Sequence, residues 1–220
     1  MTTTKKQRSV DELMEQASKA LAETNYFECE QLSLKALGRA FEKQDYESMS
    51  RIVLPLQEAR RQKRLAAIDT GRLTVIDEPI NLEEYKASPG CYLFQPPLVG
   101  ADARAFRELA DTQEVPVLVA CREPKTQLGL WPVVMIGPIT VRIRVEPPAK
   151  GKPTIDWLID ATEALGDDAI ASVDRGRELP HQINALYERL QTCREHEKLH
   201  QALAEVCREA AKEAIADGSK

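Results

Sequence analysis

Two histidines near the C-terminus flank a glutamate at a spacing that can hold zinc. The string His196-Glu197-Lys198-Leu199-His200 matches H-E-x-x-H in a segment predicted to be helical. One helical turn separates the histidines, so both could bind the metal while Glu197 activates a metal-bound water for hydrolysis. Lys198 would place a positive charge beside the cation, and nothing later on that helix can fold back as a third ligand. We therefore reject His196, Glu197 and His200 as a metal site, expect no metal, and interpret the string as a solvated helix face.

A second set of polar side chains falls in two loops that a strand–helix–strand unit would bring together. Residues 90–95 and 115–121 have the pattern of strands, and 100–111 that of the helix between them. Ligands of open parallel sheets bind beyond the carboxyl ends of the strands, and a helix N-terminus there favours an anion. The loops 95–104 and 122–126 are therefore a candidate small-anion site. The candidate ligand-binding residues are Asp102, Arg104, Arg122, Glu123, Lys125 and Thr126.

The other sequence motifs give weaker evidence for a functional site. The basic run 60–64, Arg-Arg-Gln-Lys-Arg, lies toward the end of a predicted helix, where positive charge complements the helix dipole and is usually solvated. Neither G-x-G-x-x-G nor a P-loop string occurs in the sequence, so we expect no nucleotide or other cofactor. No residue is assigned a catalytic role.

The elements that must position these residues begin with three predicted helices. Apolar residues recur at helical spacing over residues 13–67, and breaks at Thr24-Asn25 and Gln44-Asp45 divide them. Asn25-Tyr26 and Asp45-Tyr46 stand twenty residues apart, each at the entrance of an amphipathic helix. This spacing predicts a helical hairpin array.

Two strings in this array resemble the turn and second helix of tetratricopeptide repeats. They are Thr24-Asn25-Tyr26 with Lys35-Ala36-Leu37, and Gln44-Asp45-Tyr46 with Leu56. The resemblance covers about residues 13–67, a quarter of the chain, and the remainder resembles no family. Because such repeats present helical surfaces to other proteins, the resemblance implies an interaction module. A generic helical hairpin array is the alternative.

The pattern changes to that of strands after residue 67 and back to that of helices after residue 150. Residues 73–77, 131–136 and 139–145 add three strands to the two above, and Gly137-Pro138 joins the last two as a hairpin. Thr154 caps a further helix that we expect Gly166 to end. One long helix is expected from Pro180 to about Ala216.

The predicted fold class is therefore α+β. It comprises a helical repeat-like module at 1–67, an α/β domain at 68–150 with a small mixed sheet and one βαβ crossover, and a C-terminal helical region at 151–220. The apolar stripe of the last helix has no later segment to cover it. That helix is accordingly the candidate for a weak homodimer, with docking on its own chain as the alternative.

Composition narrows the class of protein. The chain has 220 residues, 43% of them hydrophobic, and a net charge of −5, which disfavours nucleic acid as a partner. Five scattered cysteines without C-x-x-C spacing favour a reducing compartment over a disulfide framework. The polar start of the chain predicts no secretory signal, and no stretch reaches the roughly 18 apolar residues of a membrane helix. We expect a cytoplasmic protein with no membrane partner.

The leading functional hypothesis is a non-enzymatic adaptor that binds another protein through its helical surfaces. The alternative is an enzyme or a small-anion-binding protein that uses the loops 95–104 and 122–126, and a zinc-dependent hydrolase ranks last. An exposed apolar groove on the helices would favour the adaptor. A pocket that holds a charged residue with a shifted pKa would favour the alternative.

Overall fold

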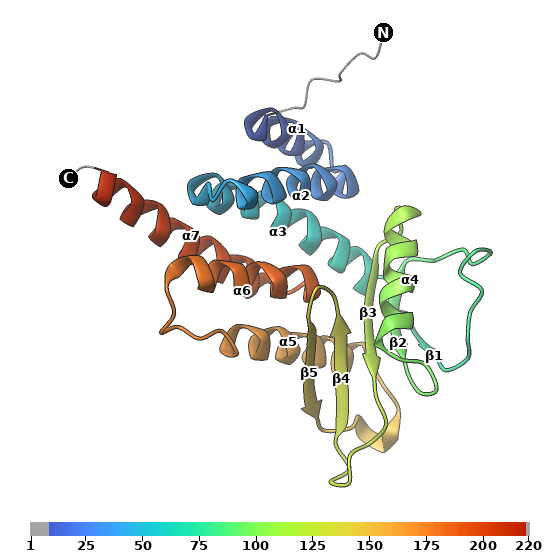
Figure 1. Cartoon of the computed structure of the whole chain (residues 1–220). Coiled ribbons are helices and arrows are strands. Elements are labelled where there is room, and N and C mark those ends of the chain that lie inside the picture. The colour runs from blue at the N-terminus through green and yellow to red at the C-terminus, as the bar shows by residue number, and fades with distance from the viewer. Residues whose placement is uncertain (1–8, 219–220) are drawn as a thin grey trace.

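The computed structural model describes residues 9–218 and confirms the α+β fold (Figure 1). Residues 1–8, on which the expectation of no secretory signal partly rests, lie outside the described residues. The described chain contains the helices α1 Val10–Ala22, α2 Tyr26–Glu42, α3 Tyr46–Ile68, α4 Gly100–Thr112, α5 Ile155–Ala171, α6 Leu179–Thr192 and α7 Glu197–Gly218, and the strands β1 Leu73–Ile76, β2 Gly90–Phe94, β3 Val117–Arg122, β4 Trp131–Ile136 and β5 Thr140–Val145. No helix of this described part is both long enough and apolar enough to cross a membrane.

The predicted helical array is present, and its two turns have the same backbone geometry. Thr24 and Gln44 both have positive φ, at 61° and 55°. The amide of Asn25 donates to the carbonyl of Ala20 at 2.8 Å, and the amide of Asp45 donates to that of Ala40 at 2.9 Å. The sequence repeat therefore corresponds to a repeated local structure. The relation to tetratricopeptide repeats stays a prediction.

The sheet has the order β1-β2-β3-β4-β5, with β1 to β3 parallel and β4 and β5 antiparallel. Alternate residues of β2 and β3 point to opposite faces, and both faces are buried, as is usual for parallel strands. On one face α4 packs through Phe106 against Tyr92 and Phe94. On the other, Cys91 and Leu93 join the large core that α3 and the C-terminal helices share.

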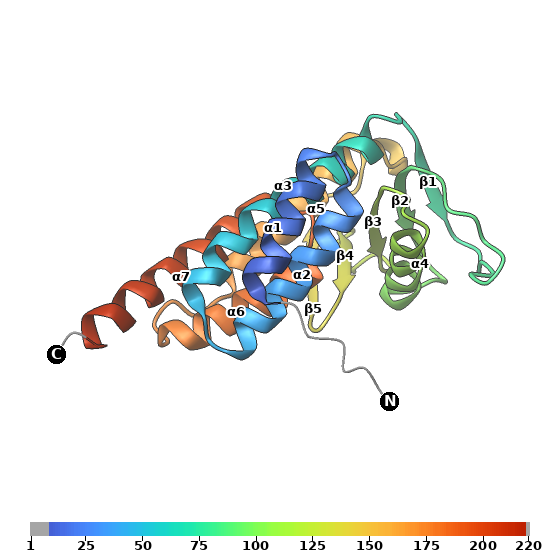
Figure 2. The ribbon, with the colours of Figure 1, turned by 90° about the horizontal axis from the view of Figure 1, so that it is seen from above.

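That large core draws buried residues from all three predicted segments of the chain. Helices α1, α2, α3 and α7 lie side by side (Figures 1 and 2), and α7 packs on both α3 and α6. Leu203 is completely buried there, and Val206 and Ala210 nearly so. The stripe that we considered for a homodimer is therefore covered by the helices of its own chain.

The prediction of one long C-terminal helix from Pro180 is wrong. The chain leaves the helical conformation at Cys193, whose φ and ψ are −100° and 63°, and α7 starts afresh at Glu197. Cys193 and His196 are buried at this break. A continuous helix would carry Leu199 and Leu203 away from α3, whereas the break lets α6 and α7 bury their apolar faces in the same core.

The prediction that Gly166 ends its helix is also wrong, because α5 continues through it to Ala171. His196 packs directly on the backbone of Gly166, so closely that a Cβ there would overlap the imidazole ring. The glycine is therefore required for close packing between α5 and the α6–α7 connection.

This close approach predicts opposite effects for two glycine-to-alanine replacements. Gly166→Ala should lower the free energy of unfolding by about 1–3 kcal/mol through overpacking. Gly38→Ala in α2 should raise it by up to about 1 kcal/mol, because alanine is the better helix former and the nearest atom to its Cβ is Tyr187 Oη at 3.8 Å. Urea denaturation measures both. In a His196→Ala background the penalty at Gly166 should disappear, and its persistence there would refute the proposed clash.

Candidate functional site

The sheet-edge residues chosen from the sequence do not form one site. The guanidinium of Arg122 lies over the Trp131 ring, 4.5 Å from its centroid, and the ammonium of Lys125 lies 5.9 Å from the same ring. Glu123 accepts two hydrogen bonds from Arg142, at 2.7 and 2.8 Å. These side chains are occupied by contacts with one another and with their neighbours along the edge.

The other three predicted residues have different contacts. Asp102 caps α4, since its Oδ2 accepts from the amide of Val99 at 2.8 Å. The Thr126 hydroxyl closes its own loop by accepting from the amide of Leu130 at 3.1 Å. Arg104 extends toward a different part of the molecule, where α4 meets α3 and the α6–α7 connection.

The H-E-x-x-H histidines are buried, so their interpretation as a solvated helix face is wrong. Nε2 of His200 faces Nη1 of Arg60 at 3.3 Å, and its Nδ1 lies 2.9 Å from the carbonyl of His196. Because a guanidinium only donates, Nε2 carries the lone pair and Nδ1 donates the proton. Burial, then the charge of Arg60, lowers the pKa of His200 to about 3. Within residues 9–218 no group of three or more His, Cys, Asp or Glu side chains is arranged to hold a metal ion.

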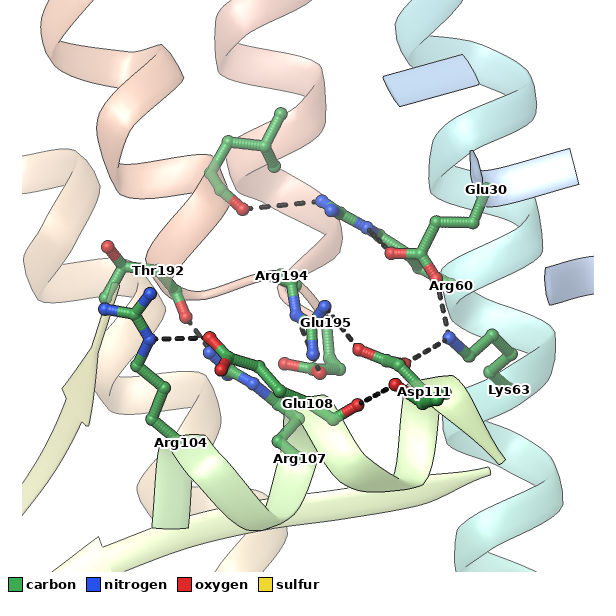
Figure 3. Close-up of polar contacts among 12 residues, drawn as sticks. Glu30, Arg60, Lys63, Arg104, Arg107, Glu108, Asp111, Thr192, Arg194 and Glu195 are labelled. Carbon is green, nitrogen blue, oxygen red and sulfur yellow. Dashed lines mark hydrogen bonds and ion pairs between the residues drawn. The ribbon is translucent and has the colours of Figure 1, made fainter. Parts of the chain in front are cut away.

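A chain of buried ion pairs joins α2, α3, α4 and the α6–α7 connection (Figure 3). Glu30 bridges Arg60 and Lys63, at 2.8 and 2.6 Å. Asp111 continues the chain from Lys63, at 3.0 Å, to Arg194, at 2.7 Å. Burial opposes the ionisation of Glu30, but Arg60 and Lys63 outweigh it and hold the pKa of this carboxyl well below its usual range.

Arg107, beside this chain, is a buried cation that forms no ion pair within the described residues, although the charges of Glu195 and Asp111 act on it from farther away. Only 6% of the surface of this residue is exposed. Nη1 and Nη2 make long contacts of 3.4 and 3.5 Å with the carbonyls of Thr192 and Ile136, and Nε has no hydrogen-bond partner. No carboxylate in the described chain forms an ion pair with it, whereas Arg60, Arg104 and Arg194 each have one. Burial and the nearby charge of Arg194 lower the pKa of Arg107 to about 10, so it stays positively charged at neutral pH.

A cavity of about 280 Å³ opens beside Arg107, and four arginines line it. The full lining is Leu34, Arg60, Arg104, Arg107, Glu108, Gly137, Pro138, Gln191 and Arg194. The β4–β5 turn packs closely on the end of α6 at this place, since a Cβ at Gly137 would lie only 2.8 Å from the Cα of Thr192. We call this space the arginine cavity.

Of the residues predicted to bind a ligand, Arg104 alone lines the arginine cavity. The basic run 60–64 was expected to be a solvated helix end, but α3 continues beyond it and Arg60 and Lys63 face the interior. A signal was present in the sequence. Arg60 lies four residues after Leu56, and Arg107 four after Ala103, so both arginines fall on the apolar stripes of their helices.

The polar lining of the cavity is mostly guanidinium, a group that pairs with anions. Its lining contains no serine, cysteine or histidine that could act as a nucleophile. The five cysteines are free and buried elsewhere, and burial raises the pKa of Cys91 to about 11 and that of Cys207 to about 12. No family model, curated protein or solved structure matches the chain. The arginine cavity is therefore the feature that bears most directly on function.

Proposed function

We propose that this protein is a non-enzymatic binding protein that takes up a small anion in the arginine cavity. The observation that carries the proposal is Arg107, a buried guanidinium with no carboxylate partner at the wall of an open cavity. An unpaired buried charge is costly, and the protein's own buried charges are otherwise paired. An anion bound beside Arg107 would supply the missing counter-ion.

The exposed apolar side chains give less support to a protein-binding groove. The large hydrophobic residues exposed in the described chain are Leu54, Leu65, Val75, Val99, Leu128 and Ile215. They come from five different elements or loops, so the criterion stated above favours the anion. The adaptor remains the second proposal, supported by the matching turns at Thr24 and Gln44. A cytoplasmic location, which five free cysteines suit, is likewise proposed.

Anion-dependent stabilisation tests the proposal. We expect acetate or methanesulfonate, exchanged for chloride at constant ionic strength, to raise the melting temperature of the full chain. At 100 times its Kd a ligand adds about 2.7 kcal/mol, which is about 5–10 °C for a chain of this size. Arg107→Met should abolish the specific shift without loss of stability, because it replaces an unpaired buried charge with an apolar side chain.

Arg142→Met is the matched control. Arg142 is half exposed and pairs with Glu123 at the distant sheet edge, so this variant should keep the full anion response. Any general effect of the anions on protein hydration will appear equally in all three proteins. Equal shifts in the wild type and Arg107→Met, for both anions, would refute the proposal.

A further inference from the structure

We infer that the ligand of the arginine cavity carries a single negative charge and is a small carboxylic acid, not a phosphate monoester. This inference rests on the proposed function and identifies the chemical class that the site selects. Three observations lead to it: the balance of charge around the cavity, the single unpaired guanidinium, and the acceptor groups on the wall.

The charged side chains around the cavity leave an excess of one positive charge. Five of them line the cavity, and ion pairs join the others to these five; Figure 3 labels them all. The cations are Arg60, Lys63, Arg104, Arg107 and Arg194, and the carboxylates are Glu30, Glu108, Asp111 and Glu195. Five cations face four carboxylates, so one carboxylate from a ligand balances the cluster. A phosphate dianion would leave it with an excess negative charge beside the buried groups Glu30, Arg60 and Arg107, whose charges water screens poorly.

The guanidinium groups that line the cavity are not equally free. Arg60 and Arg194 are held by Glu30 and Asp111 at 2.8 and 2.7 Å, and Arg104 is held by Glu108 at 2.7 Å. Only Arg107, among the arginines of this lining, has no carboxylate partner. One planar guanidinium fork matches one planar carboxylate through two parallel hydrogen bonds.

Four acceptor groups in or beside the wall oppose a second negative charge. The carboxylate of Glu108 lines the cavity, and the carbonyls of Ile136 and Thr192 point toward Arg107. The carbonyl of Gly137 points toward Arg104, at 3.5 Å from its Nη1. All four groups are hydrogen-bond acceptors, so they repel an additional anionic oxygen.

The rest of the cavity suits a short organic body. Leu34 and Pro138 provide apolar surface and Gln191 an amide. The volume of about 280 Å³ is close to the lower end of small-molecule sites, roughly 300–1,000 Å³. The ligand class is thus a carboxylic acid with a small, partly apolar body.

Three probes with an ethyl group test the charge rule: propionate, ethanesulfonate and ethyl phosphate. Their binding to the full chain can be followed by NMR chemical-shift titration at pH 7.5 and constant ionic strength, where a phosphate monoester with a second pKa near 6 is a dianion. We expect propionate to bind at least as tightly as ethanesulfonate, and ethyl phosphate at least tenfold more weakly than either. Ethyl phosphate binding as tightly as propionate would overturn the inference while leaving the proposed function standing. If no probe shifts the resonances in an Arg107-dependent way, the proposed function itself fails.

Glu108→Gln provides an independent arm. The change removes one carboxylate from the wall and releases Arg104, so the excess rises to two positive charges and a second guanidinium becomes free. The affinity ratio of ethyl phosphate to propionate should rise about tenfold relative to the wild type. Glu209→Gln, at an exposed position of α7, should leave the ratio unchanged. An unchanged ratio in Glu108→Gln would show that charge balance does not set the selectivity, and would overturn the inference.

Discussion

Replacing Glu30 with glutamine is expected to lower the free energy of unfolding by about 3–5 kcal/mol, the usual cost of breaking a buried ion pair by removing one partner. Glu30 is 5% exposed and is the only carboxylate that Arg60 contacts in the described chain. The amide has no charge to offer, so the buried guanidinium would lose its counter-ion. Urea denaturation at pH 7 gives the value.

The control is Glu28→Gln on the same helix, at an exposed position, which should change stability by less than about 0.5 kcal/mol. A double variant, Glu30→Leu with Arg60→Met, should recover most of the loss, because it removes both buried charges and Lys63 keeps its contact with Asp111. If Glu30→Gln costs no more than its control, the ion-pair chain does not stabilise the protein in the way its geometry implies.

Acidification from pH 6.5 to 4.5 is expected to lower the free energy of unfolding by about 2.3 kcal/mol through His200 alone, because the slope reaches 1.36 kcal/mol per pH unit only well below the unfolded pKa. The folded protein keeps His200 neutral down to a pKa of about 3, whereas in the unfolded chain the imidazole binds a proton below its ordinary pKa of 6.5. The unfolded state therefore binds more protons as the pH falls, and stability is lost in that direction. Burial also lowers the pKa of His196, although Glu163 and Asp167 oppose it, so this residue adds to the same loss.

Measurements of stability against pH on His200→Gln test this expectation. The variant should lose most of the slope between pH 6.5 and 4.5, and His181→Gln, at an exposed position of α6, should keep it. Glu30 also titrates, but its depressed pKa means that its contribution is lost only below the unfolded value of about 4.5. A wild-type protein whose stability is flat over the window would refute the assignment of a neutral, buried His200.

The sequence predicted those parts of the fold that local pattern determines. Helices α2 and α3 begin just after the turns at Thr24 and Gln44, as the turn residues predicted. The alternating pattern of β5 buries Val141 and exposes Arg142 and Arg144. The role of Gly166 was missed because it depends on a contact with His196, thirty residues away along the chain. Glycine stops a helix by local preference, and only tertiary packing can reverse that role.

The sequence predicted an anion site at the sheet edge, whereas the anion site that we propose lies in the arginine cavity. An anion was expected at the sheet edge, where Arg122 is instead stacked on Trp131. Arg60 and Arg107 were treated as solvated or were not considered, because charged residues are rarely buried. The pairing of each arginine with a carboxylate depends on how four distant segments of the chain meet. The spacing of residues in the sequence does not show this, so it could not predict that Arg107 lacks a carboxylate partner.

The residues that line the arginine cavity lie far apart in the sequence, and this separation affects the rate of unfolding. Arg60 contacts the carbonyl of Leu190, 130 positions away, and contacts of such separation form late because closing a long loop costs entropy first. An interaction that is absent from the folding transition state slows unfolding and leaves the folding rate nearly unchanged. A bound anion should therefore lengthen the lifetime of the folded protein, and with it the resistance to proteases that cleave the opened chain.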